Sequence, residues 1–167
     1  MRFLRAIRLD QSDSHVYEVA AESGEWAIPG GFTFADVEPE ALTGKTRQAF
    51  ARGFLGTTSF GWTTLVEVAE ISETEFEALI ERLASHFVAR YGAPDLAAAR
   101  AAAQAEAEFA AGLCEHKVHT LLALEREIGD EGIVERFKVI QPPREPQHAK
   151  VWAIVEDDVE DDIESGA

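Results

Sequence analysis

The sequence predicts an α+β fold, in which a mostly antiparallel sheet is covered on one face by two longer helices and followed by an acidic tail. Two apolar stripes with helical spacing occupy the middle of the chain. Segments rich in strand formers flank them and follow one another without crossover helices, which favours antiparallel pairing. With 167 residues, the chain is long enough for one domain and short for two. We therefore expect a single domain over residues 1–156 and a flexible tail over 157–167.

The first part of the chain predicts a hairpin and a tight turn. Residues 3–9 and 15–21 are rich in strand formers and flank the polar segment DQSDS, which is typical of a hairpin. Pro29 and Gly30 fit a type II turn, because proline fixes φ at one central position and glycine allows the positive φ of the next. The stretch from Trp26 to Phe34, which contains this turn, is expected to form a second extended pair.

The following residues predict two short helices, a strand and a capped helix. The short helices are expected over about 36–44 and 45–55, and residues 62–71 form the clearest strand candidate. Ser72 and Glu75 match the capping-box pattern, so a helix should run over about 72–91. The apolar stripe of this helix consists of Phe76, Leu79, Ile80, Leu83, Phe87 and Tyr91.

An alanine-rich segment predicts the second long helix. It begins at Asp95 and keeps helix-forming residues up to about Ile128, before Gly129 and Gly132 stop it. Two final strands are expected over 133–140 and 150–155, joined by a proline-rich connection.

The net charge of −16 limits the classes of partner. Such a surface repels phosphate backbones and anionic lipids, so we expect neither nucleic acid nor a membrane as partner. A basic protein or a cation is favoured, and acidity that serves only solubility is the alternative. A single cysteine excludes an internal disulfide, and the N-terminal arginines leave no signal-peptide core, so the cytoplasm is the expected compartment.

The acidic tail has a regular apolar pattern. Val155, Val159 and Ile163 are four positions apart, with acidic residues between them. In a helix they would form a narrow stripe that suits an apolar, basic groove on a protein partner. A disordered tail that keeps the chain soluble is the alternative. Besides such a partner, an accessory domain of this kind is compatible with a homodimer.

Four polar or ionisable residues fall within the predicted helix 95–128: Cys114, His116, His119 and Glu125. On a helical wheel Cys114 lies in the apolar stripe, whereas both histidines lie on the opposite face, so the thiol cannot share a metal ion with them. His116 and His119 remain weak metal candidates, a solvated helix face is the alternative, and no cofactor is expected. Glu125 falls only about 20° from Cys114, so its carboxylate must be paired, protonated or beyond the packed region. A buried or rim ion pair with Arg136, Arg5 or Arg8 is expected, and a carboxylate that lines a pocket or a frayed helix end is the alternative.

The stretches WAIPGGFTF and AFARGFLGTTSFGWTTLVEVAEI, with the downstream GAPD and its alanine-rich segment, resemble a small, functionally uncharacterised proteobacterial family. The resemblance covers nearly the whole chain. It implies a single-domain cytoplasmic accessory protein and assigns no catalytic residue.

Two hypotheses for function follow. The first is a non-catalytic cytoplasmic accessory or protein-binding domain, favoured by the acidic surface and the patterned tail. The alternative is a small-molecule-binding protein or enzyme, with a pocket between the Trp26–Phe34 turn, the Gly- and Phe-rich loop 52–64 and the face that carries Glu125. Its candidate ligand-binding residues are Trp26, Ser59, Trp62, Glu125 and Arg136.

Overall fold

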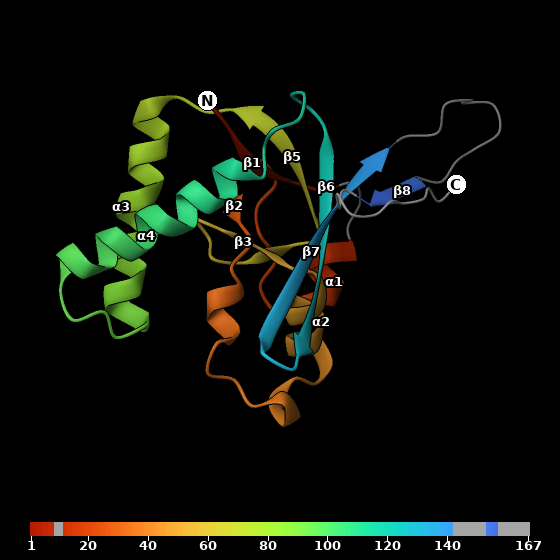
Figure 1. Ribbon diagram of the computed structural model, residues 1–167, viewed down its shortest axis with the longest axis horizontal. Helices are drawn as coiled ribbons and strands as arrows, with labels where there is room; N and C mark the ends of the chain where they lie inside the picture. Colours follow the sequence, from red (N-terminus) through yellow and green to blue (C-terminus); the bar gives the residue numbers. More distant parts are fainter. Residues whose placement is uncertain (9–11, 142–152, 157–167) are drawn as a thin grey trace.

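The computed structural model describes residues 1–8, 12–141 and 153–156 of the protein, built around one antiparallel sheet (Figure 1). Eight strands follow one another in the order β4-β3-β2-β1-β5-β6-β7-β8. The strands are β1 (Arg2–Ile7), β2 (Trp26–Ile28), β3 (Phe54–Gly56), β4 (Trp62–Thr63), β5 (Leu65–Glu70), β6 (Leu121–Gly129), β7 (Gly132–Gln141) and β8 (Ala153–Glu156). The helices are α1 (Ser12–Val16), α2 (Gly44–Arg52), α3 (Glu73–Arg90) and α4 (Leu96–Gly112), with 3-10 turns η1 (Gly31–Phe34) and η2 (Pro39–Ala41).

The two longer helices, α3 and α4, pack against each other on one side of the sheet, which confirms the predicted α+β fold (Figure 1). Helices α1 and α2 lie apart from this pair, and α2 contacts β6. Within the described ranges, no helix is long and apolar enough to cross a bilayer.

The main core lies between the sheet and the α3–α4 pair. The predicted capping box opens α3: the Ser72 side chain accepts from the Glu75 amide, and the Glu75 side chain accepts from the Ser72 amide. The apolar stripe of α3 is buried up to Phe87, whereas Tyr91 is 46% exposed. Helix α4 contributes small side chains that allow close packing, and all of them are fully buried: Ala99, Ala103, Ala107 and Ala110.

The predicted helix over 95–128 is wrong beyond Gly112. Helix α4 ends there, residues 113–120 form a loop, and the chain then enters the sheet as β6. β6 lies between β5 and β7 and pairs with β7 along its full length, from Leu121 opposite Ile140 to Gly129 opposite Gly132. Residues of high helix propensity therefore form a strand, because pairing with β7 along the whole strand, and with β5 at Leu121 and Leu122, outweighs a local preference of tenths of a kcal/mol.

The predicted hairpin of residues 3–9 and 15–21 is also wrong. β1 is a strand, but its partners are β2 and β5, and the second segment begins within helix α1. Asp13 of α1 is buried and accepts three hydrogen bonds, from the Thr63 hydroxyl and from the amide and hydroxyl of Thr64. These bonds attach α1 to the junction of β4 and β5, so the segment folds toward that junction and does not extend along β1.

The turn at Pro29–Gly30 is followed by a different structure from the one predicted. Gly30 has the expected positive φ of 79°, but Gly31–Phe34 forms the 3-10 turn η1 where an extended segment was expected. The Thr33 amide and hydroxyl both donate to the Gly30 carbonyl, which stabilises the tight turn. Phe54 and Leu55, expected in the preceding helix, belong to strand β3.

Candidate functional site

The predicted ligand-binding residues Trp26, Ser59 and Trp62 lie in β2, in the loop after β3 and in β4. Trp26 lies in β2 with its ring edge-to-face with Phe3. The Ser59 hydroxyl donates to Glu25 at 2.6 Å, which closes the exposed loop between β3 and β4. Trp62 packs on Phe34, and these two residues line a hollow of about 250 Å³ beside α2.

Glu125 and Arg136 line a hollow beside α2, and the predicted position of Glu125 inside an apolar stripe is wrong. The Glu125 side chain is 55% exposed and forms an ion pair of 3.0 Å with Lys138. Arg136 is opposite Glu125 in the β6–β7 register, yet its ion pair is with Glu127, at 3.5 Å. A strand alternates its side chains, so the interior position is occupied by the neighbour of Glu125, Arg126.

Cys114, His116 and His119 lie in and around the loop that follows α4. The Cys114 thiol is buried and donates to the Ala110 carbonyl, and burial raises its pKa to about 12. His119 contacts the Glu67 carboxylate at 3.1 Å, and the His116 carbonyl accepts from Arg2. In the part of the chain that the structure describes, no three His, Cys, Asp or Glu side chains gather as metal ligands.

The predicted partner-binding stripe is only partly within the described residues. Val155 lies in β8, opposite Val139 of β7. Val159 and Ile163 lie outside the described residues.

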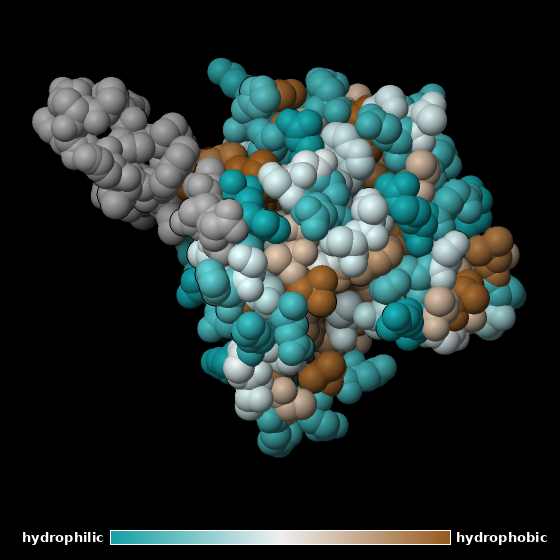
Figure 2. All heavy atoms as spheres, turned by 180° about the vertical axis from the view of Figure 1, so that it is seen from behind, coloured by the Kyte–Doolittle hydropathy of each residue, from teal (hydrophilic) through white to brown (hydrophobic). Residues whose placement is uncertain are grey.

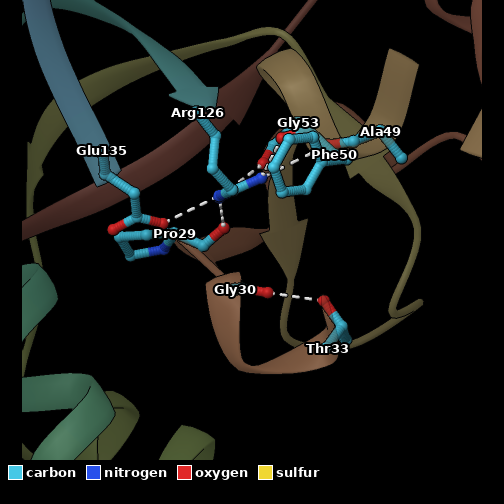
Figure 3. A network of polar contacts seen from close by, with 8 residues as sticks. All are labelled: Pro29, Gly30, Thr33, Ala49, Phe50, Gly53, Arg126 and Glu135. Carbon is cyan, nitrogen blue, oxygen red and sulfur yellow. Dashed lines mark hydrogen bonds and ion pairs between the residues drawn. The ribbon is translucent and has the colours of Figure 1, made fainter. Parts of the chain in front are cut away.

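Arg126 is the centre of a buried polar network (Figure 3). Its side chain is fully buried, and its Nε donates to Glu135 on the neighbouring strand β7 at 2.9 Å. The two terminal nitrogens donate to four backbone carbonyls, so all five N–H groups are used. These carbonyls belong to Ala49, Phe50, Gly53 and Pro29.

The Arg126 network joins three segments that are distant in sequence. Ala49 and Phe50 lie in the last turn of α2, where the helix dipole favours a cation, and the Ala49 carbonyl also accepts from the Gly53 amide. Pro29 precedes the η1 turn, and Glu135 belongs to β7. Burial lowers the pKa of Arg126, and the hydrogen bond and charge of Glu135 oppose that shift. The network therefore fixes the position of the turn against β6 and β7.

A hollow of about 330 Å³ opens beside this network, between the turn, α4 and β7. Glu106 and Glu135 are its two carboxylates, and the remaining walls are mostly apolar. The Glu135 carboxylate accepts a hydrogen bond from Arg126. Gly31 packs so closely on Glu135 that a Cβ atom at position 31 would lie 2.7 Å from the Glu135 Oε2 atom. The apolar and backbone lining consists of Pro29, Gly31, Phe32, Phe109 and Ile133.

Glu106 is the unusual residue of this hollow. It is half-buried on α4, and its carboxylate makes no hydrogen bond or ion pair with the described part of the chain. Burial, and then the charge of Glu135, raise the pKa of its carboxyl group. A half-buried carboxylate near a second carboxylate, with no cation of its own, is destabilising in the free protein. Shifted carboxyl groups in hollows are typical of binding or catalytic sites.

The rim of the hollow is apolar and exposed. Phe109 is 49% and Ile133 is 36% exposed, and Ile128, opposite Ile133 in the β6–β7 register, is 48% exposed. On the face seen in Figure 2, by comparison, hydrophilic residues dominate and hydrophobic ones form small separate groups. The hollow thus combines negative charge with a rim of large apolar side chains, a combination suited to a cationic, partly apolar group.

Replacing Glu106 by Gln is expected to stabilise the protein at neutral pH, by about 1 kcal/mol, because it removes an unpaired charge from a half-buried position. The pKa of Glu106 is raised in the folded state, so its ionisation destabilises the fold above that pKa and has no effect below the unfolded value. The gain should therefore fade as pH falls toward the ordinary carboxyl range. Melting temperatures of both proteins across that range test this, and an equal gain at every pH would contradict it.

Sequence reasoning missed both key residues, although each leaves a local signal. The buried positions of β6 are two apart, as in a strand, and the third of them is charged: Leu122, Leu124 and Arg126. Glu106 lies three positions after Ala103 and four before Ala110, at the edge of the buried alanine stripe.

The fold and the hollow define an antiparallel α+β domain with an acidic, apolar-walled hollow between its second long helix and its sheet. The chain belongs to a family of unknown function, DUF6505, whose model matches residues 1–157. The family is uncharacterised, as the sequence resemblance implied. No curated protein and no solved structure matches the chain.

Proposed function

We propose that this protein is a non-catalytic accessory domain of the cytoplasm that binds a basic protein partner. The observation that carries the proposal is the exposed apolar rim of Phe109 and Ile133 around the carboxylate of Glu106. Exposed apolar side chains that surround a few polar groups are typical of protein-binding surfaces. The net charge of −16 favours a basic partner, because the field of the whole molecule attracts it and repels acidic competitors.

The positions of the other polar side chains support a binding role. The carboxylates of Asp13, Glu25 and Glu67 and the guanidinium of Arg126 all accept or donate within the fold. They attach helices, loops and strands to one another, and their internal bonds account for their positions. Glu106 differs because the described chain gives it no such bond.

Substituting Phe109 by Ser tests the proposed surface. The full-length wild-type protein, isolated gently from its native cells, should retain a basic polypeptide in stoichiometric amount. Phe109→Ser should lose at least about 90% of it, because loss of a central aromatic contact of about 2 kcal/mol weakens binding more than tenfold.

Leu96→Ser is the matched control, since Leu96 is 53% exposed at the other end of the same helix. It should retain the partner, provided that both variants melt like the wild type. Equal retention by Phe109→Ser, or a wild-type protein that retains no polypeptide, would contradict the proposal.

A small-molecule-binding protein is the second candidate, and one observation favours it. Pro29, Gly31 and Phe32 of the predicted pocket turn line the hollow with Glu106. The 52–64 loop and Glu125 line other hollows, at Trp62 and at Arg136. Mass spectrometry of molecules released from the unfolded, purified protein distinguishes the two: a stoichiometric organic cation of low mass would favour this candidate.

A further inference from the structure

Glu106 has no cation from the described part of the chain, and Arg126, in the network beside the hollow, is fully used. Each of the five N–H groups of Arg126 already donates, one to Glu135 and four to backbone carbonyls. Turning the guanidinium toward Glu106 would leave buried carbonyls of α2 and the turn without donors, at about 1–3 kcal/mol each. The carboxylate of Glu106 is therefore available to a cation from outside the fold.

Glu135 adds a second acceptor to the hollow. Only its Oε2 atom bonds Arg126, and Oε1 makes no hydrogen bond with the described residues. The Glu135 side chain is 18% exposed, so it reaches the hollow and is held rigidly by Arg126. The incoming group thus meets one carboxylate fixed by the fold and one that is unpaired.

The walls favour an organic cation over a metal ion. Divalent cations such as Ca²⁺ need six or more oxygen ligands, and most of this lining is aromatic or aliphatic. Phe32, Phe109 and Ile133 suit the methylene stem of a long basic side chain. A guanidinium also stacks on aromatic faces and donates to carboxylates in a planar fork, which an ammonium cannot do.

We propose that this hollow binds one arginine side chain of the basic partner, with its guanidinium paired to Glu106 and Glu135 and its stem against Phe109. This inference rests on the proposed function and adds the chemistry of the contact. It also explains why a destabilising carboxylate is present at this position, since the partner supplies the missing cation.

The test uses the full-length protein and blocked tripeptides of the form Gly-X-Gly, in which X is arginine, lysine or the neutral isostere citrulline. Dissociation constants are measured by titration followed by NMR, at neutral pH and low salt. The wild type should bind the arginine peptide at least about tenfold more tightly than the citrulline peptide, since hydrogen bonds to charged groups are worth about 1.5–3 kcal/mol. Glu106→Gln should lose this tenfold preference.

Glu108→Gln is the matched control, because Glu108 is an exposed carboxylate two positions further along α4 and changes the net charge by the same amount. It should bind the arginine peptide within about twofold of the wild type, as expected for a distant surface charge.

Three results would overturn the site. The wild type and Glu106→Gln could bind the arginine peptide with equal affinity, the wild type could bind the citrulline peptide as tightly as the arginine peptide, or the wild type could bind no peptide. Equal affinity for the lysine peptide would overturn its assignment to arginine. A protein partner that is lost with Phe109→Ser but kept by Glu106→Gln would leave the proposed function standing while this inference fails.

Discussion

Replacing Arg126 by Met is expected to lower the free energy of unfolding by about 3–5 kcal/mol, the range for removing one partner of a buried ion pair. Methionine retains the apolar volume of the stem but donates no hydrogen bond. Glu135 would lose its cation, and the carbonyls of Pro29, Phe50 and Gly53 would lose their donor while remaining inside the fold. Equilibrium unfolding in urea, fitted with the slope as well as the midpoint, measures the loss.

Arg136→Met is the matched control for this substitution. Arg136 lies opposite Glu125 on the neighbouring strand, is 53% exposed and forms only a surface ion pair. Its loss should change stability by no more than about 0.5 kcal/mol. Glu135→Gln combined with Arg126→Met should destabilise less than the sum of the single changes, because the two side chains are bonded. An Arg126→Met protein as stable as Arg136→Met would show that the network contributes nothing.

Replacing Gly30 by Ala is expected to destabilise the protein by about 2–4 kcal/mol, the sum of a strained backbone and an overpacked contact. Gly30 has φ of 79°, a conformation that costs alanine about 1–2 kcal/mol. A Cβ at this position would also lie 2.7 Å from the Leu55 Cβ atom and 3.3 Å from the Trp62 ring. The Leu55 Cβ atom cannot withdraw easily, since Leu55 is buried in β3. Thermal unfolding monitored by circular dichroism measures the change.

Gly92→Ala separates the two contributions. Gly92 has a similar φ of 69°, but a Cβ there would meet no atom within 4 Å. It should therefore show only the backbone cost of about 1–2 kcal/mol. Equal losses at the two glycines would mean that the turn moves away from Leu55 and Trp62 without resistance.

The elements with strong local signals were predictable. The capping box fixes the start of α3, and the alternation along residues 65–70 identifies β5. The positive φ of Gly30 follows from the Pro-Gly pair alone. In each case a few adjacent residues determine the backbone, so no knowledge of the rest of the fold is needed.

β6 could not be predicted from its own residues. Leu121, Leu122, Leu124 and Ile128 satisfy a helical stripe as well as a strand, and leucine, alanine, glutamate and arginine all favour helices. The strand forms because β5 and β7 lie on either side of this segment and pair with it. The wrong period had one specific result: it placed Glu125 inside, whereas the strand exposes Glu125 and buries Arg126.

The candidate site was not predictable, because its members come from three separate parts of the chain. Phe32 belongs to the η1 turn, Glu106 to α4 and Glu135 to β7. Periodicity describes which face of one element is buried, but it does not say which elements meet. The internal use of all five Arg126 donors is a property of the assembled fold, and so is the lack of a cation beside Glu106 in the described part of the chain.

The position of β1 in the sheet determines the order in which the protein can fold. β1 and β5 are the two middle strands of the sheet. Arg5 and Glu67, which are 62 positions apart, must therefore come together before the middle of the sheet can form. The β6–β7 hairpin closes through the short connection between Gly129 and Gly132 and can form by itself in about 1–10 μs. Joining β1 to β5 requires closure of a long loop, which slows folding. During synthesis β1 therefore leaves the ribosome well before its partner, and the sheet is assembled from its middle only after β5 has followed.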